Sequence, residues 1–543
     1  MYSGKFLKNC WPFILSAIIL VSASLFLLNQ ILSDYNGKFI YALDDPYIHL
    51  SIAKNFADYG IWGIGQNFAS ASSSLLFPLM LALIYKVTGY LEYVPFCLNI
   101  IFALLIVFTM FNAFQKKGHS DGYTFLAIVM VLFFTPVLPL IFSGMEHVIQ
   151  IFLFLALLMK LADYLAFYNS ENQCAASKKE DTAEPVNFLW ILTLTSLLAM
   201  IRFEGLFMAA AISVVLVYLK QISRAVFVIL GSALPIIFFG LISKYNDSFF
   251  LPNSILIKGN FPNVANIGDF FYYSFSFLFK LYANPHLIVL FVLLVMTLIL
   301  LFNVENSSNS NKNEKILILV YLSSLIMHLQ FCQVGWFYRY EAYLAASGAF
   351  LFFYLWKDFF DYKDIKVLIL KITLFAMIFF PLFFRGHGSF LSILPAVGNI
   401  YQQQYQMGLF LNKYYKNHAV ALNDVGAANF FANIKCVDLF GLANNDIAAA
   451  KLDKKFTTGI IREVCKKNNV KVAILYENWF GDKFEIPPEW NKVAEWGINN
   501  LTVAGGDTVS FFAPDKEDAK KLYENLKEFS SALPPEVMQK GIK

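Results

Sequence analysis

The chain has 543 residues, of which 58% are hydrophobic and only 15% are charged, and its mean hydropathy is +0.56. Soluble domains carry about 25% charged residues, so the composition excludes an ordinary soluble protein and indicates a polytopic membrane protein. The net charge of +4 is small and the cations are scattered over short loops, which argues against a nucleic-acid-binding surface.

Apolar runs of roughly 17–25 residues are long enough to cross a bilayer. The sequence predicts about eleven membrane-spanning helices, near residues 11–32, 93–114, 122–142, 145–166, 187–202, 204–220, 225–243, 286–303, 316–334, 341–356 and 367–385. The first run is longer than the apolar part of a signal peptide, about 7–15 residues, so we expect it to be retained as a span.

Residues 75–90 are ambiguous, because Pro78 interrupts their apolar run and Lys86 lies within it. Cytoplasmic loops are enriched in Lys and Arg, and the cationic loops fall on one side only if this segment does not cross. We therefore expect a juxtamembrane or half-buried helix here, a cytoplasmic N-terminus and an external C-terminus. The cationic loops are those with Lys5/Lys8, Lys116/Lys117, Lys178/Lys179, Lys220/Arg224, Lys312/Lys315 and Lys357/Lys363/Lys366.

The stretch DDPYIHLSIAKNFADYG (44–60) follows the first span and predicts an amphipathic helix. Pro46 is favoured in the first helical turn, and Asp45 is the expected N-cap. The pattern is typical of a helix that lies in the membrane interface. Its apolar face consists of Ile48, Ile52, Phe56 and Tyr59, and its polar face of His49, Lys54 and Asp58.

Asp44 and Asp45 are the candidate catalytic residues. A charge at the bilayer boundary is costly unless it is paired or hydrated, so such residues are functional candidates. A general base has to be ionised and within hydrogen-bond reach of the proton that it takes, and Asp44 suits this role. The alternative is two solvated loop aspartates, one of which caps a helix.

The other predicted external loops carry cations that are candidates for binding a phosphate, namely Arg202, Lys258 and Arg339. Arg presents a fork of donors and Lys a point charge. Ion pairs of Arg202 with Glu204 and of Arg339 with Glu341 are the alternative.

Further site candidates lie on the same loops. His49 and His147 are candidate ligands, together with the aspartates, of a divalent metal ion, or else hydrogen-bonding residues. Glu146 and Tyr338 complete the set. Tyr338 belongs either to an interfacial aromatic belt or to a surface that stacks on sugar rings.

From about residue 386 the composition becomes that of a soluble α/β domain, so we expect a membrane domain at 1–385 and an external domain at 386–543. HAVALND (418–424) and VKVAIL (470–475) predict buried strands, and residues 456–469 and 515–533 predict helices. Cys436 and Cys465 are candidates for a disulfide if this domain is outside the cytoplasm. Asp424 follows a strand, where ligand binding and a turn role are both open. We expect the domain to bind the acceptor or to pack over the membrane cleft.

Taken together, these stretches resemble the GT-C superfamily of membrane glycosyltransferases, which use polyprenyl-phosphate sugars. Within it, the chain is most similar to AftB-like, arabinofuranosyltransferase-related bacterial proteins. The resemblance is carried by residues 44–63, 69–83, 143–147 (SGMEH), 202–207 (RFEGLF), 250–260, 339–344 (RYEAYL) and 421–444. RFEG stands where the family usually has Arg-Pro-Glu-Gly, and SSSLLFP where it usually has Thr-Ser-Pro, so the donor sugar stays open.

The resemblance implies a protein of the bacterial inner membrane that transfers a hexosyl or pentosyl unit. The donor would be a polyprenyl-phosphate sugar, and the acceptor an extracytoplasmic glycan, lipid-linked sugar or protein. Asp44 matches the catalytic base, and Arg202, Lys258 and Arg339 fall near the donor phosphate. Membrane lipid is an expected partner and nucleic acid is not. The alternatives are a flippase for the same lipids, which would place paired charges and broken helices at the midplane, and a non-enzymatic scaffold.

Overall fold

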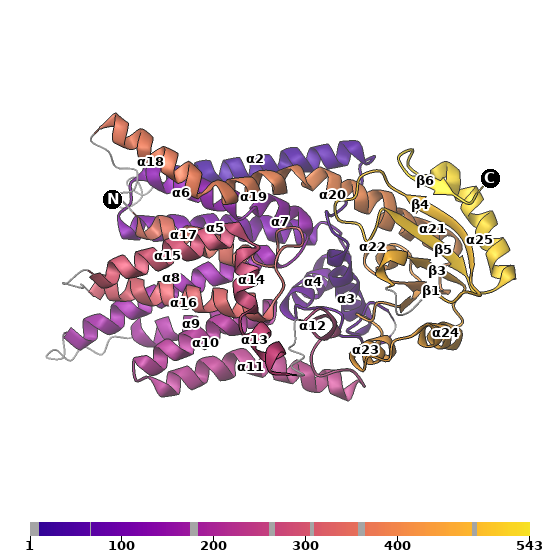
Figure 1. Ribbon diagram of the computed structural model, residues 1–543, viewed down its shortest axis with the longest axis horizontal. Helices are drawn as coiled ribbons and strands as arrows, with labels where there is room; N and C mark the ends of the chain where they lie inside the picture. The colour runs from indigo at the N-terminus through magenta and orange to yellow at the C-terminus, as the bar shows by residue number, and fades with distance from the viewer. Residues whose placement is uncertain are drawn as a thin grey trace.

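The computed structural model describes residues 10–65, 67–173, 183–259, 266–303, 309–356, 364–480 and 486–542. The predicted signals at Lys5, Lys8, Lys178, Lys179, Lys357 and Lys363 lie outside these residues. A bundle of helices forms one part of the molecule, and an α/β domain with a six-stranded sheet lies at one end of it (Figure 1).

Apolar helices of the bundle coincide with the predicted spans. Six described helices are long and apolar enough to cross a membrane, and two bent pairs bring the number to eight. Because α10, α17 and the apolar part of α9 (Phe188–Ile201) are shorter, the count of eleven crossings stays a prediction. The helices are α2 (Trp11–Asp34), α5 (Val94–Lys117), α6 (Asp121–Phe134), α7 (Val137–Ser143), α8 (His147–Gln173), α9 (Ala183–Ile201), α10 (Gly205–Tyr218), α11 (Ile222–Tyr245), α13 (Ile267–Ser274), α14 (Ser276–Tyr282), α15 (Pro285–Asn303), α16 (Asn309–Phe331), α17 (Ala342–Leu355), α18 (Ile365–Ile378) and α19 (Phe380–Leu391).

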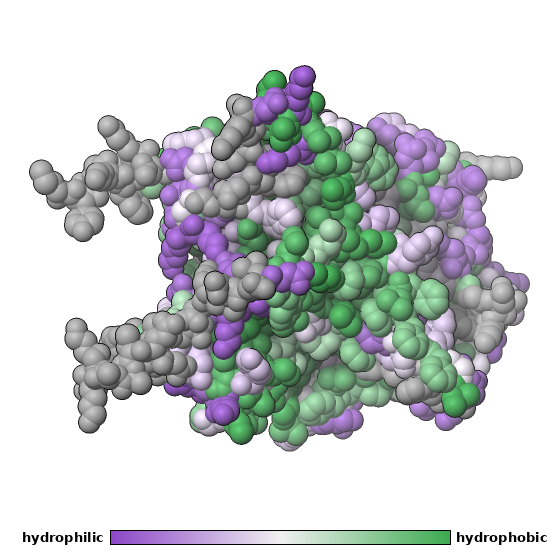
Figure 2. Space-filling view, turned by 60° about the vertical axis from the view of Figure 1, so that its left-hand side comes forward, coloured by the Kyte–Doolittle hydropathy of each residue, from purple (hydrophilic) through white to green (hydrophobic). Residues whose placement is uncertain are grey.

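On the face shown in Figure 2, hydrophobic residues form a broad band between hydrophilic ends of the molecule. On α11, for example, Phe238 and Leu241 are 67% and 59% exposed. Contiguous apolar surface of this extent marks an interaction with another apolar phase, and helices of this length and composition match the hydrocarbon core of a bilayer. The chain is therefore an integral membrane protein.

Cationic loops meet at the end of the bundle remote from the sheet. Lys117, at the end of α5, pairs with Glu314 near the start of α16. Lys116 pairs with Asp163, sixteen residues after the start of α8 (Nζ–Oδ1 3.3 Å). This agrees with the shared side that the sequence predicts, whereas the compartment that each end faces stays a prediction.

Three short helices, α3 (Asp45–Tyr59), α4 (Leu76–Thr88) and α12 (Asn253–Lys258), lie between the bundle and the sheet domain (Figure 1). α4 is the helix predicted at 75–90, and its 13 residues extend about 20 Å, less than the ~30 Å hydrocarbon core. The interfacial position expected for α3 stays a prediction, but the packing of its two faces differs from the expected pattern. Ile48 and Ile52 pack in one cluster with Val425 of the sheet domain, and His49, expected on a polar face, is 3% exposed.

A nearly continuous helix connects the two parts. After α19 the chain runs through α20 (Ile393–Ile400), the π-helix η1 (Tyr401–Tyr405) and α21 (Gln406–Tyr414). The expected domain boundary at residue 385/386 falls inside α19, and the helix carries the chain from the bundle to the sheet.

The sheet has the strand order β2-β1-β3-β5-β4-β6, in which β1 is parallel to β2 and β3, while β5 is antiparallel to β3 and β4, and β6 to β4. The predicted strands β1 and β3 and the predicted helices α24 and α25 are confirmed. The bounds are β1 (Ala419–Leu422), α22 (Ala427–Phe430), β2 (Lys435–Asp438), α23 (Asn445–Leu452), α24 (Thr458–Lys467), β3 (Val472–Leu475), η2 (Glu477–Trp479), β4 (Asn491–Gly497), β5 (Thr508–Ala513), α25 (Lys516–Phe529), η3 (Ser530–Ala532) and β6 (Met538–Lys540).

The disulfide considered between Cys436 and Cys465 does not form, and both thiols are free. Cys436, on β2, packs against the cluster that contains Val420. Cys465, on α24, belongs to the cluster that contains Ala421. Because neighbouring strand residues point to opposite faces, the two thiols are separated by the sheet.

Candidate active site

Two cavities meet at the start of α3. The inner cavity, about 400 Å³, lies where α3 and α12 meet the bundle helices. The outer cavity, about 270 Å³, lies between the bundle and the sheet domain. Asp45 and Lys258 line both, and among the acidic residues that line either cavity in the described chain, Asp45 alone lines both.

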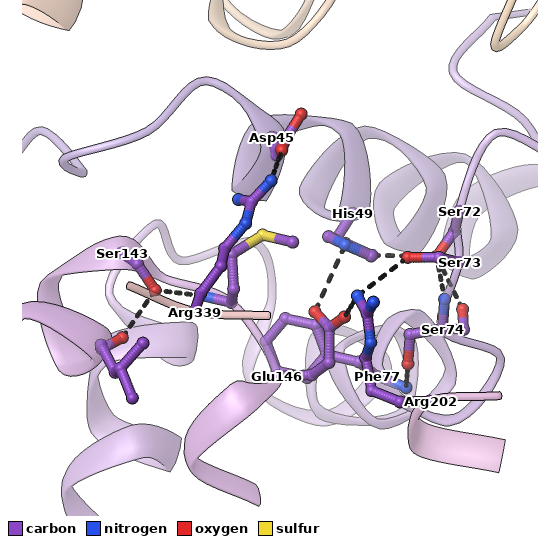
Figure 3. Close-up of polar contacts among 12 residues, drawn as sticks. Asp45, His49, Ser72, Ser73, Ser74, Phe77, Ser143, Glu146, Arg202 and Arg339 are labelled. Carbon is purple, nitrogen blue, oxygen red and sulfur yellow. Dashed lines mark hydrogen bonds and ion pairs between the residues drawn. The ribbon is translucent and has the colours of Figure 1, made fainter. Parts of the chain in front are cut away.

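Asp45 forms ion pairs with two cations. α3 begins at Asp45 itself, with Asp44 at the preceding position, and the Asp44 side chain makes no capping hydrogen bond. The expected role of Asp45 as N-cap is therefore wrong. Its carboxylate instead accepts a hydrogen bond from Arg339 Nη2 (Figure 3) and lies 3.9 Å from Lys258 Nζ. Burial alone would raise the pKa of Asp45, but Lys258 and Arg339 outweigh it and lower this pKa below its usual value.

The hydrogen-bonding groups of the Arg339 guanidinium are only partly satisfied by the described residues. The ion pair considered between Arg339 and Glu341 is absent, because Arg339 bonds Asp45 instead. Arg339 is 2% exposed, and within the described chain its Nε and Nη1 have no hydrogen-bond partner. Unsatisfied buried donors on a charged group are costly.

Arg202, by contrast, donates four hydrogen bonds to protein oxygens. Its Nε and Nη2 donate to the two carboxylate oxygens of Glu204 at 3.1 and 2.6 Å. Its Nη1 donates to Glu146 Oε1 at 3.0 Å and to Ser73 Oγ at 3.2 Å (Figure 3). The ion-pair alternative for Arg202 and Glu204 is confirmed, so Arg202 fixes the wall of the inner cavity.

His49 and His147, the candidate metal ligands, have different surroundings. His49 Nε2 lies 3.5 Å from Glu146 Oε2, and its Nδ1 lies 3.1 Å from Ser72 Oγ. Burial lowers the pKa of His49, which favours its neutral form. His147 is buried with neither ring nitrogen bonded in the described chain.

These residues do not fit a metal ion. No group of three or more His, Cys, Asp and Glu arranged to hold a metal occurs among the described residues. Asp45 is occupied by two cations, and both ring nitrogens of His49 have protein partners. A metal ion usually needs several such ligands around one point.

Glu341 organises the loop that carries Arg339. It accepts hydrogen bonds from Gly335 N and pairs with Arg385 Nη2 at 2.8 Å. Arg385 Nη2 also donates to the carbonyl of Tyr338 at 2.8 Å. Four consecutive residues, Gly335 to Tyr338, have φ values of 89, 38, 54 and 60°. Non-glycine residues in this region cost about 1–3 kcal/mol each and persist only where the surroundings impose them.

Tyr338 lines neither cavity. Its ring stacks over the Arg385 guanidinium, 5.2 Å away, so Tyr338 belongs to the support of the loop. Tyr340, two residues later, lines both cavities and was not among the predicted site residues.

Asp44 connects the bundle to the sheet domain. Its Oδ2 and Oδ1 accept hydrogen bonds from Gly426 N and Ala427 N, both at 2.7 Å. A Cβ on residue 426 would lie 2.2 Å from Asp44 Oδ2, so only glycine fits. Asp424, held by Gln404 Nε2 at 2.9 Å, lies beside Asp44. Burial, and for Asp44 also its proximity to Asp424, raises the pKa values of both carboxyl groups.

Several lining residues received no individual role from the sequence. They are Ser72 and Ser73 in the bundle, and Asn423 and Trp479 in the sheet domain. The position of Asp424 directly after a strand, and the resemblance over residues 421–444, pointed to the contribution of the sheet domain.

Comparisons with known proteins show which families and solved structures the chain is similar to. Residues 398–512 match a family model described as a domain of unknown function, DUF8728, and no curated protein matches the chain in sequence. ArnT from Cupriavidus metallidurans bound to undecaprenyl phosphate has a TM-score of 0.52 and 9% identity, over 92% of this chain and 98% of that one. An apo oligosaccharyltransferase from Archaeoglobus fulgidus has a TM-score of 0.53 and 12% identity, over 94% and 75%.

A third structure, AglB from Archaeoglobus fulgidus with an inhibitory peptide and a dolichol-phosphate, has a TM-score of 0.51 and 11% identity, over 95% of this chain and 75% of that one. The chain has the GT-C fold. The superfamily resemblance of the sequence is thereby confirmed at the level of the fold, while the AftB-like specificity stays a prediction.

Proposed function

We propose that this GT-C protein is a membrane glycosyltransferase that moves one sugar from a polyprenyl-phosphate donor to an acceptor in the outer cavity. The observation that carries the proposal is the position of Asp45. It lies where the two cavities meet, with Arg339 and Lys258 beside it. A donor in one cavity and an acceptor in the other would meet at this carboxylate.

The inner cavity suits a lipid phosphate. Its walls include the apolar side chains Phe203, Leu206 and Phe207, which match an isoprenoid chain. The Arg339 and Lys258 side chains, which both line this cavity, would receive the phosphate, since charge-assisted hydrogen bonds of this kind are the strong ones. ArnT was solved with undecaprenyl phosphate and AglB with a dolichol-phosphate, which supports the same ligand class here.

The chemistry is a displacement at the anomeric carbon. The acceptor oxygen forms the new bond, the bond from that carbon to the phosphate oxygen breaks, and its electron pair leaves with the phosphate. The hydroxyl proton passes to a carboxylate. We place this base at Asp45, because phosphate bound to Arg339 and Lys258 would weaken the two ion pairs that lower its pKa. Cations aimed at the departing phosphate supply electrostatic stabilisation.

Asp44, the base expected from the sequence, is the alternative. Both of its oxygens already accept backbone hydrogen bonds from the sheet domain, which favours a positioning role. Variants of the two aspartates separate these roles, as described in the Discussion.

We further propose that the site and the sheet domain face outward from the inner membrane of a bacterial cell. The cationic loops at the opposite end of the bundle support this orientation through the positive-inside rule. The site charges lie at helix ends rather than within the spans: Arg202 directly follows α9, and Arg339 and Glu341 precede α17. A flippase would need paired charges near the midplane, so this placement favours an interfacial enzyme.

The proposal is tested by mass profiling of envelope glycans with and without the protein, together with native mass spectrometry of the purified full chain and undecaprenyl phosphate. Loss of one glycan species without the protein, and specific lipid binding that Lys258→Ala and Arg339→Ala weaken, are expected. Lys116→Ala is the matched control, since Lys116 is 68% exposed at the other end of the bundle. Identical glycan profiles, or lipid binding that is equal in all variants, would refute the proposal.

A further inference from the structure

The outer cavity has a second wall that the transfer chemistry alone does not require. Besides Asp44 and Asp45 from the bundle, it is lined by Asn423, Asp424 and Trp479 of the sheet domain. At about 270 Å³ it is near the lower end of small-molecule sites, roughly 300–1,000 Å³. This size fits the end of a short chain of sugars better than a folded protein surface.

This wall lies at the carboxyl ends of the parallel strands. Asn423 and Asp424 follow β1, Phe440 follows β2, and Trp479 ends the turn that follows β3. The chain passes from β1 to β2 on one side and then to β3 on the other. In open α/β sheets, ligands bind in the crevice at the carboxyl ends, where the strand order reverses. The fold thus points to a ligand at the same place as the cavity.

Aromatic rings form a supported platform here. The Trp479 ring stacks on Tyr476, with centroids 5.8 Å apart and planes at 25°, and contacts Phe440 edge-on at 5.2 Å. Its Nε1 donates to Gly505 O at 2.7 Å, which fixes the indole. A Cβ on Gly505 would lie 2.6 Å from the Tyr476 ring and 3.0 Å from Trp479, so this packing requires glycine.

Fixed polar groups stand beside the platform. Gln404, on the π-helix η1, holds Asp424 Oδ2 at 2.9 Å, and π-helical turns occur frequently at functional sites. Asn423 exchanges two hydrogen bonds with the backbone of Tyr476 (2.9 and 3.1 Å), which joins the ends of β1 and β3. An aromatic face with carboxylate and amide groups at its edge matches a sugar ring, whose C–H face is apolar and whose rim carries hydroxyls.

We propose that the outer cavity is a carbohydrate site, in which Trp479 stacks on a sugar unit of the acceptor and Asp424 binds its hydroxyls. The inference rests on the proposed function and narrows the acceptor from glycan, lipid-linked sugar or protein to a sugar-bearing molecule. Trp479 and Asp45 line the same cavity. A sugar unit stacked on Trp479 would therefore present a free hydroxyl group toward the Asp45 carboxylate.

The test uses fluorescently labelled full-length protein in detergent. It is applied to an array of pentose, hexose and N-acetylhexosamine mono- to tetrasaccharides, supplemented with glycans released from the envelope of the producing cell, and to a peptide array. We expect binding to carbohydrate only, and at least about tenfold weaker binding for Trp479→Ala, as for a truncated aromatic anchor. Gly505→Ala should act in the same direction. Tyr523→Ala, on the remote helix α25, is the aromatic control and should bind as wild type.

The thermal unfolding midpoint of each variant reports whether it is folded, and undecaprenyl phosphate binding, measured on the same samples, keeps the two proposals separate. If this lipid does not bind but carbohydrate binding depends on Trp479, the proposed function fails and the carbohydrate site stands. If the lipid binds and no carbohydrate does, or if carbohydrate binding survives both Trp479→Ala and Gly505→Ala, the site is overturned. Binding to peptides alone overturns it as well. Competition between a lipid-linked disaccharide and the same free disaccharide tells which carrier presents the sugar.

Discussion

Replacing Asp44 by asparagine tests how the sheet domain is held over the cavities. The carboxylate offers one oxygen to Gly426 N and the other to Ala427 N, both at 2.7 Å. Asparagine offers only one oxygen, so one of these N–H groups would face an NH2 group and lose its acceptor.

The size of the effect follows from these two contacts. An ordinary hydrogen bond contributes about 0.5–1.5 kcal/mol, and a buried donor left without a partner costs about 1–3 kcal/mol. Asp44 is 8% exposed, so water does not readily replace the lost acceptor. We therefore expect Asp44→Asn to weaken docking by about 2–4 kcal/mol, which corresponds to a roughly 30- to 700-fold faster local opening.

Hydrogen exchange followed by mass spectrometry measures this opening at Gly426 and Ala427. Asp438→Asn is the matched control, because Asp438 accepts two backbone hydrogen bonds of the same length, from Phe440 N and Ala443 N, inside the sheet domain. That variant should loosen its own turn and leave residues 426–427 protected.

The same experiment decides between the two roles of Asp44. If Asp44 positions the sheet domain, loss of glycan product in Asp44→Asn should accompany loss of protection at 426–427. Unchanged protection together with complete loss of product would refute the positioning role and return the base to Asp44, as the sequence suggested.

Three further outcomes are expected. Asp45→Asn should abolish product yet bind undecaprenyl phosphate at least as tightly as wild type by native mass spectrometry, since its carboxylate competes with phosphate for the same two cations; weaker binding would contradict this. The raised pKa values of the buried Asp44 and Asp424 carboxyls mean that their stabilisation is complete below the ordinary value of about 3.9 and is lost as pH rises through the raised values. Protection at 426–427, corrected for intrinsic exchange, should therefore fall with pH. Asp424→Asn should reduce this fall without removing it, because burial, the largest cause of the raised Asp44 pKa, remains. Arg385→Met should lower the midpoint of thermal unfolding, because breaking a buried ion pair costs about 3–5 kcal/mol, whereas Lys413→Met, which breaks an exposed pair with Glu528, should leave it within error.

Local rules were sufficient for the parts of the fold that depend on neighbouring residues. Long apolar runs predicted the bundle helices, because a segment that faces lipid must be apolar along its length. The β1 and β3 strands and α24 and α25 were readable from short buried runs and from helical periodicity. The charged tips at Asp45, Arg202 and Arg339 were recognisable as site candidates, because charges at span ends are rare and costly.

Pairings between those tips were not readable, because they join residues that are far apart along the chain. Arg339 is 294 residues from its partner Asp45, and Gly426 is 382 residues from Asp44. Local spacing favoured the neighbours Arg202–Glu204 and Arg339–Glu341; the first pair forms, and the second is displaced by Arg385.

The sequence by itself determined which segments enter the membrane and which charges gather at their ends, because hydropathy and helical periodicity are local properties. Only the tertiary structure decided which of two adjacent aspartates lines both cavities and which one holds the sheet domain. One peptide unit separates them, but the helix that begins at Asp45 turns its side chain toward Arg339 while Asp44 meets the amides of Gly426 and Ala427. That division depends on the packing of three distant segments around α3, which no local pattern records.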